Sequence, residues 1–155
     1  MKPEYGKVIV GFPGVGKSAL AYNNDYVIDL DSSLFNVNDK KPEGWEIQYC
    51  NVARWLCRCG FTVCVSAHKE VRKELLRKPA DEQILVYPSL DLKNEWCLNL
   101  SMNYHFSMPD IKRLRYEYIK RNYDDSIKEL MSETGFKHIV IEDMGYYLAE
   151  MLGIR

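Results

Sequence analysis

The sequence predicts an α/β fold, a single doubly wound domain around a mainly parallel, five-stranded sheet. Short β-branched runs alternate with longer helical patterns along its 155 residues, which is typical of parallel sheets with crossover helices. The first apolar run leads directly into a glycine-rich turn, GFPGVGKS at 11–18. A composition of 46% hydrophobic and 28% charged residues is that of a soluble globular domain with a real core.

The first half of the chain gives three strands and two helices. KVIV predicts a strand at 7–10, and the turn is followed by a short helix at 17–22 and a strand at 26–30. Residues 31–41 are polar and predict a loop. The second helix is expected to begin at Pro42-Glu43 and to end at Gly60. Its buried face is predicted from apolar residues spaced four, three, four and three apart: Trp45, Tyr49, Val52, Leu56 and Cys59.

The second half repeats the alternation. The expected elements are strands at 61–65, 84–87 and 138–141, helices at 69–78 and 91–103, a helix from about 107 to Gly135 with a break near 123–126, and a short C-terminal helix. Pro79 ends the helix that precedes the fourth strand.

Charge and cysteine usage exclude several functional classes. The net charge of −1 gives no field for nucleic acid, and no window approaches the roughly 18 apolar residues of a membrane span. The N-terminus has no signal-peptide pattern. The five cysteines match no zinc or redox spacing, and four of them lie among apolar residues of expected helices or a strand. We interpret them as reduced thiols, which predicts a cytoplasmic protein.

The glycine-rich turn satisfies the phosphate-loop pattern G-x-x-x-x-G-K-[ST]. Glycines let several main-chain N–H groups point at phosphate oxygens, and the following helix adds the positive end of its dipole. Lys17 is expected to reach the β- and γ-phosphates, and the Ser18 hydroxyl to bind Mg²⁺. The predicted ATP-binding residues are Gly11, Pro13, Gly14, Val15, Gly16, Lys17, Ser18 and Ala19.

Two carboxylates follow the second expected strand. Strand ends in a parallel sheet face the ligand crevice, and the alternation of a strand puts Asp29 and Asp31 on the same side. We predict that they act in catalysis, with Asp29 beside the metal and the pair orienting or deprotonating an acceptor hydroxyl. The alternative is a solvated turn with a helix cap, because Ser32 and Ser33 follow.

The order of elements resembles the small kinases of the adenylate, shikimate and gluconate kinase group, and small phage-type nucleotide kinases most of all. The residues that carry the resemblance are GFPGVGKS at 11–18, VIDLD at 27–31, VSAHKEVRKEL at 65–75 and ILVYP at 84–88. The resemblance implies a P-loop fold of the nucleoside monophosphate kinase type. It implies transfer of the γ-phosphoryl group of ATP, with Mg²⁺, to a small-molecule acceptor, of which a nucleoside monophosphate or nucleoside is favoured.

The resemblance also implies an acceptor-binding segment at about 31–60. Arg54 and Arg58 lie four residues apart on one helix face, where a guanidinium would suit an acceptor phosphate. Ser66 and Arg72 are the other predicted acceptor-binding residues. Ordinary surface arginines are the alternative for the first pair.

A lid-like segment is expected at about 98–122. Related kinases carry arginines near the start of the lid, whereas the stretch 95–103 has asparagines. Arg113 and Arg115 are the predicted catalytic substitutes, with Arg121 a third candidate, because phosphoryl transfer requires compensation of spread negative charge. A solvated helix face beside Glu117 is the alternative.

Three other interpretations stay open. Ile139–Asp143 is similar to a strand that ends in a catalytic acid, which predicts an NTPase or nucleotide switch. A kinase that phosphorylates a sugar acid or another hydroxyl metabolite is a second possibility. A nucleotide-binding protein without activity is the third.

Overall fold

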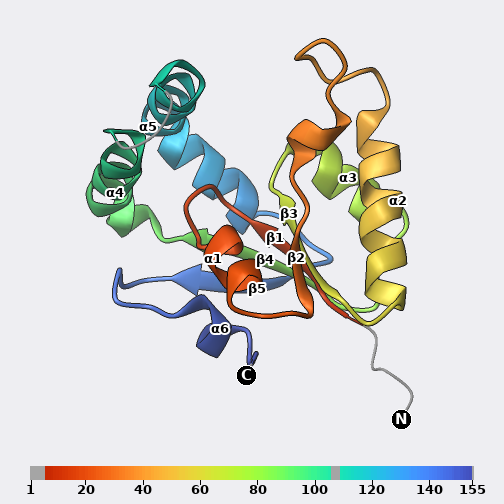
Figure 1. Cartoon of the computed structure of the whole chain (residues 1–155). Coiled ribbons are helices and arrows are strands. Elements are labelled where there is room, and N and C mark those ends of the chain that lie inside the picture. The colour runs from red at the N-terminus through yellow and green to blue at the C-terminus, as the bar shows by residue number, and fades with distance from the viewer. Residues whose placement is uncertain (1–5, 106–108, 155) are drawn as a thin grey trace. The chain divides into compact units, whose positions relative to one another are not determined.

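The structure, a computed structural model, describes residues 6–105 and 109–154. It has five strands: β1 (Val8–Gly11), β2 (Val27–Asp29), β3 (Thr62–Ser66), β4 (Gln83–Pro88) and β5 (Lys137–Ile141). They form one all-parallel sheet in the order β2-β3-β1-β4-β5, with helices on both of its sides (Figure 1). The predicted α/β class and the predicted five strands are therefore confirmed.

Helices follow each of the five strands, as the alternation of the sequence predicts. They are α1 (Lys17–Tyr22), α2 (Trp45–Arg58), α3 (Lys69–Arg77), α4 (Lys93–His105), α5 (Pro109–Met131) and α6 (Leu148–Met151), with short 3₁₀ helices η1 (Ser32–Phe35) and η2 (Leu90–Leu92). The described residues form two compact units. One holds residues 6–86 and 135–138, and the other holds 87–105, 109–134 and 139–154. The expected lid at 98–122 falls in the second unit, apart from 106–108, which lie outside the described residues.

β1 is the central strand of the first unit. It pairs in parallel with β3 on one side and with β4 on the other. Val8, Ile9 and Val10 have no exposed surface, as expected for a strand covered on both faces. Gly11, the last residue of β1, is aligned with Ser66, the last residue of β3. The register therefore places the start of the glycine-rich loop beside the end of β3.

The first residue of α2 and part of its buried face differ from the prediction. Gly44, with a φ of 77°, precedes the first helical residue, so the expected start at Pro42-Glu43 is wrong by about one turn. The left-handed backbone at Gly44 turns the chain into the helix, a conformation that glycine adopts without strain. The buried face consists of Trp45, Tyr49, Cys50, Ala53, Arg54 and Cys57. Cys59, predicted on the buried face, is exposed.

α5 is one continuous helix, so the predicted break near 123–126 is wrong. Tyr123 is fully buried, and its hydroxyl donates a hydrogen bond to the carbonyl of Ser89 at 2.8 Å. Ile119 and Ile127, one turn before and one turn after it, are also buried. A buried stripe at this spacing continues the helix through a polar stretch of sequence.

In the described part of the chain, no helix combines the length and apolarity that a membrane span requires.

The cysteines give a direct test of the core. All five are free thiols, and Cys59 is the exposed one. Burial raises the pKa of Cys50 and Cys64 to about 12 and that of Cys57 to about 11. We expect a thiol reagent at about pH 8, near the pKa of a free thiol, to modify one cysteine rapidly in the native protein. Cys59→Ser should abolish the rapid reaction, and a second fast thiol in the wild-type protein would contradict the burial.

Candidate functional site

The glycine-rich loop is a tight connection between β1 and α1. Gly14 and Gly16 have φ values of 92° and 106°, in the left-handed region that side chains disfavour. Val15, between them, has no exposed surface, and its N–H donates to the carbonyl of Phe12 at 3.2 Å. The buried valine anchors the loop to the core, while the two glycines allow the backbone to reverse around it.

Lys17 folds back over the beginning of this loop. Its ammonium donates a hydrogen bond to the carbonyl of Gly11 at 3.0 Å. A Cβ atom at Gly11 would lie 2.8 Å from a Val15 methyl group and 2.9 Å from the Lys17 side chain. Since Val15 is buried and cannot move aside, only glycine leaves room for this arrangement. The loop thus holds an ammonium group against its own main chain.

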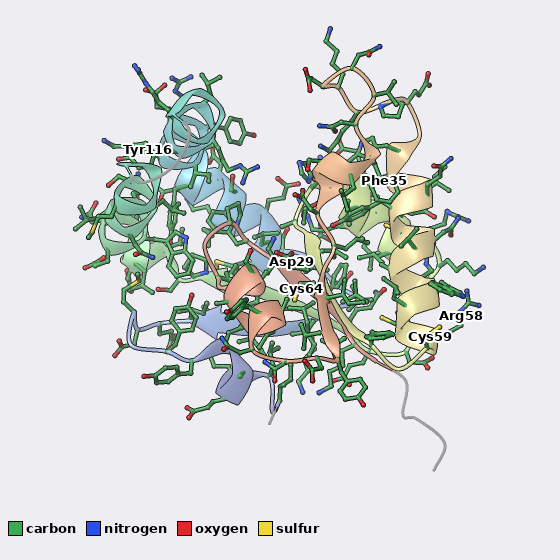
Figure 2. All side chains as sticks on the ribbon, viewed as in Figure 1. Asp29, Phe35, Arg58, Cys59, Cys64 and Tyr116 are labelled. Carbon is green, nitrogen blue, oxygen red and sulfur yellow. The ribbon has the colours of Figure 1, made fainter. Side chains whose placement is uncertain are left out.

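Ser18 and Asp29, predicted as a metal-binding pair, are in direct contact. The hydroxyl of Ser18 donates to Oδ2 of Asp29 at 2.8 Å. Asp29 ends β2, which pairs with β3 through Cys64, and Figure 2 shows Asp29 and Cys64 close together on these strands. A hydroxyl and a carboxylate are hard oxygen ligands of the kind that Mg²⁺ prefers. Within the described residues no group of three or more His, Cys, Asp or Glu side chains could hold a metal ion.

Asp31, predicted as a second catalytic carboxylate, caps η1. Its Oδ1 accepts a hydrogen bond from the N–H of Ser33 at 2.9 Å. This is the alternative that the sequence left open, a turn with a helix cap. Asp31 is an exposed residue.

Tyr49 joins the ends of β2 and β3 on the side of the loop. Its hydroxyl donates to the carbonyl of Leu30 at 2.6 Å and accepts from the N–H of Ser66 at 3.0 Å. Burial raises the pKa of Tyr49 to about 12, so the phenol keeps its proton at neutral pH. Ser66, a predicted acceptor ligand, also shares a hydrogen bond of 2.7 Å with Nδ1 of His68. Sequence reasoning missed Tyr49 and His68 as parts of this edge, because Tyr49 is predicted only as part of a buried helical face and His68 stands in the segment 65–75 without a predicted role.

Arg54 serves the packing of α2 on α3. The residue is buried, and its guanidinium donates to the carbonyls of Lys78 and Glu74 at 2.8 and 2.7 Å. It also pairs with the buried Glu74 carboxylate at 3.3 Å. The guanidinium of Arg77, the main cause, and that of Arg54 hold the pKa of Glu74 below its usual value. These contacts fully engage the Arg54 fork within the core of the first unit.

Arg58 lies at the other end of α2 from the site. Its neighbour Cys57 accepts a hydrogen bond from the N–H of Gly6 at 2.9 Å, which places this end of the helix beside the amino end of β1. Figure 2 shows Arg58 well away from Asp29. The structure therefore does not bring Arg54 or Arg58 to the glycine-rich loop. Arg72, the third predicted arginine, is buried and donates to the carbonyl of Ala67, just after β3, at 3.1 Å.

The role of Arg54 can be tested by stability. We expect Arg54→Met to lower the free energy of unfolding by about 2–3 kcal/mol, because a buried carbonyl, a part-buried carbonyl and the Glu74 carboxylate lose a charged donor while Arg77 still pairs with Glu74. The matched control Arg58→Met, on the exposed end of the same helix, should change stability by less than about 0.5 kcal/mol. Urea melts measure both, and equal losses would contradict the assigned role of Arg54.

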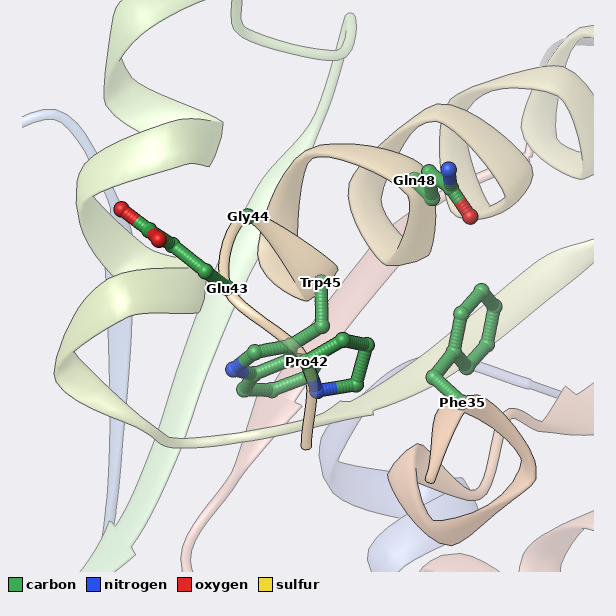
Figure 3. A pocket seen from close by; sticks show the side chains of 6 residues that line it. All are labelled: Phe35, Pro42, Glu43, Gly44, Trp45 and Gln48. Carbon is green, nitrogen blue, oxygen red and sulfur yellow. The ribbon is translucent and has the colours of Figure 1, made fainter. Parts of the chain in front are cut away.

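A small pocket lies between η1 and the beginning of α2. It has a volume of about 140 Å³, and its lining residues are Phe35, Pro42, Glu43, Gly44, Trp45 and Gln48 (Figure 3). Phe35 belongs to a stretch that the sequence predicts as loop, and Trp45 was predicted as part of the buried helical face. Sequence patterns alone could not show that the two rings share one pocket.

The predicted catalytic arginines lie on α5 in the second unit. Arg113 is exposed and pairs with Glu117 one turn further along the helix at 3.4 Å. Arg115 is exposed as well. The pair with Glu117 is the alternative that the sequence left open, and a role of these arginines in catalysis stays a prediction.

Comparison with known proteins adds no assignment to this geometry. No protein-family model matches the sequence, and a search of curated proteins finds no match either. The function is therefore argued from the residues of the site.

Proposed function

We propose that the chain is an ATP-dependent small-molecule kinase with a P-loop fold of the nucleoside monophosphate kinase type. The observation that carries the proposal is the 2.8 Å hydrogen bond between Ser18 and Asp29, next to a loop that holds Lys17 over its main chain. The phosphate-loop pattern supplies the lysine and the serine, and a separate strand supplies the carboxylate. Three groups with complementary roles in phosphoryl transfer thus lie at the carboxyl ends of β1 and β2.

The loop residues fit a polyphosphate. The glycine at position 11 lets Val15 and the Lys17 side chain pack closely against the start of the loop, and Gly14 and Gly16 let main-chain N–H groups turn toward a bound anion. The Lys17 ammonium exchanges the Gly11 carbonyl for phosphate oxygens and stabilises the charge that develops during transfer. These groups bind and orient ATP as substrate.

Ser18 and Asp29 fit a magnesium ion. The Ser18 hydroxyl and the Asp29 carboxylate would hold the ion, directly or through water. When bound, Mg²⁺ neutralises phosphate charge and orients the transferred group. Asp29 also orients the Ser18 hydroxyl, and a carboxylate at this edge can accept the proton of an acceptor hydroxyl.

The end of β2 favours a kinase over a simple NTPase. In an NTPase whose metal is held by the acidic end of β5, Asp29 would have no function. Asp29 instead contacts Ser18, the residue that the phosphate-loop pattern assigns to the metal, and this contact favours a kinase. In the second unit, Oδ1 of Asp143 accepts a hydrogen bond from the N–H of Gly145 at 2.7 Å. That contact completes a local turn.

The proposal is tested by incubating the protein with ATP, Mg²⁺ and a panel of nucleotides, nucleosides and sugar acids. We expect ADP to form only with an acceptor, together with a phosphorylated acceptor. ADP release of equal rate without acceptor would identify an NTPase. Bound ATP with no release would identify a binding protein. A Lys17→Ala preparation purified in parallel controls for contaminating kinases.

A further inference from the structure

Two walls of the pocket in Figure 3 are the aromatic rings of Phe35 and Trp45, and contacts with neighbouring side chains hold both rings in place. The ring of Phe35 meets Tyr49 edge to face, with centroids 5.3 Å apart, and the indole of Trp45 contacts Tyr49 at 5.4 Å. Trp45 is further held by the ring of His68 at 5.5 Å and by the Lys41 ammonium, 5.2 Å from its centroid. Walls that are held in place before binding reduce the cost of ordering on ligand capture.

The lining suits a flat, uncharged ring. Phe35, Pro42 and Trp45 offer apolar surfaces, and Figure 3 shows the Gln48 amide directed toward the side where Phe35 lies. An amide both donates and accepts, so it can read the edge of a heterocycle. The lining holds one charged residue, Glu43, whose carboxylate points away from Phe35, and no basic residue. A carboxylate or phosphate group of an acceptor would find no counter-charge among these side chains.

The volume of the pocket matches a single ring. A cavity of about 150 Å³ accommodates one benzene-sized molecule, and this pocket measures about 140 Å³. A six-membered heterocycle fills that space, whereas the second ring of a purine would extend beyond the lining residues and gain fewer contacts.

Tyr49 connects the pocket with the end of β2, where Asp29 lies. Tyr49 contacts both aromatic walls, and its hydroxyl donates to the carbonyl of Leu30, the residue between Asp29 and Asp31. We propose that this pocket holds the base of the phosphate acceptor, and that the acceptor is a nucleoside or nucleotide with a single-ring, pyrimidine base. The proposal rests on the proposed kinase function, because it names the acceptor of that reaction.

The test is calorimetric titration of the full chain with CMP, UMP, AMP and GMP, and with the four corresponding nucleosides. The protein is first saturated with Mg²⁺ and a non-hydrolysable ATP analogue, so that the phosphate loop is occupied and the binding of the analogue is measured separately. We expect CMP or UMP to bind at least about tenfold more tightly than AMP and GMP, a difference of about 1.4 kcal/mol.

Variants assign the binding to the pocket. Phe35→Ala and Gln48→Ala should each weaken the binding of the pyrimidine nucleotide about tenfold and leave the ATP analogue unaffected. Gln48 is exposed, so its replacement does not endanger the fold. Ile47→Ala is the matched control, because Ile47 is exposed on the same turn and does not line the pocket. The control should bind like the wild-type protein.

Three outcomes would overturn the proposal. If purine nucleotides bind as tightly as pyrimidine nucleotides, the proposed preference for a single-ring base is wrong. Wild-type affinity for the pyrimidine nucleotide in both Phe35→Ala and Gln48→Ala would show that the base does not bind in this pocket. An ATP analogue that binds while no pyrimidine nucleotide or nucleoside binds would refute the acceptor pocket and leave the kinase proposal intact, whereas failure of the analogue itself to bind would remove both proposals.

Discussion

Replacing Lys17 with alanine is expected to abolish turnover while the protein stays folded. The ammonium of Lys17 is the charged group that the loop holds over its main chain, 3.0 Å from the carbonyl of Gly11. Loss of one preorganised donor to a developing negative charge costs about 10²–10³-fold in kcat. A full positive charge at a transferring phosphoryl group is expected to contribute at the upper end of this range or above it.

Steady-state ADP formation measures the loss in Lys17→Ala, and thermal unfolding shows that the fold persists. The matched control is Lys73→Ala, which removes the same charge from an exposed position on α3. It should turn over at the wild-type rate. Wild-type activity in Lys17→Ala would refute the role assigned to the loop.

Replacing Asp29 with asparagine is expected to remove activity but not ATP binding. The asparagine carbonyl can still accept the hydrogen bond that Ser18 donates, so the local geometry is retained. The negative charge that is proposed to hold Mg²⁺ is lost, and with it the proposed base for an acceptor hydroxyl. We expect kcat to fall by about 10²–10³-fold. The dissociation constant of ATP should change by less than about tenfold, which is 1.4 kcal/mol.

The comparison for Asp29→Asn is Asp25→Asn, which removes a carboxylate from the exposed turn before β2. Kinetics and nucleotide titration separate the two effects. If Asp29→Asn lost ATP affinity but kept its turnover number, Asp29 would be a nucleotide-binding residue and not a catalytic one.

The strands and the glycine-rich turn between β1 and α1 could be predicted because their signals are local. A β-branched run predicts a strand from neighbouring residues, and eight successive residues specify the loop. The pairing of Ser18 with Asp29 followed from the same logic, since consecutive parallel strands present their carboxyl ends at one edge. Predictions of this kind require only the order of elements and the alternation within each strand.

The acceptor side depends on contacts between distant residues, which no periodicity reveals. Arg54 carries a charge, and nothing in its own helix indicates that it pairs with Glu74, twenty residues further along. The ring of Phe35 packs against Tyr49 from a segment that is polar and aperiodic in sequence. Likewise, the polar residues after Tyr123 suggested a break in α5, whereas burial of the Tyr123 ring continues the helix.

The central claim is that the loop at 11–18 binds the polyphosphate of ATP. A crystal structure of the protein grown with Mg²⁺ and a non-hydrolysable ATP analogue tests it most directly. The account predicts phosphates within the loop, the Lys17 ammonium moved from the Gly11 carbonyl to a phosphate oxygen, and Mg²⁺ beside Ser18 and Asp29. An empty loop at saturating analogue, with Lys17 still bonded to Gly11, would contradict the account.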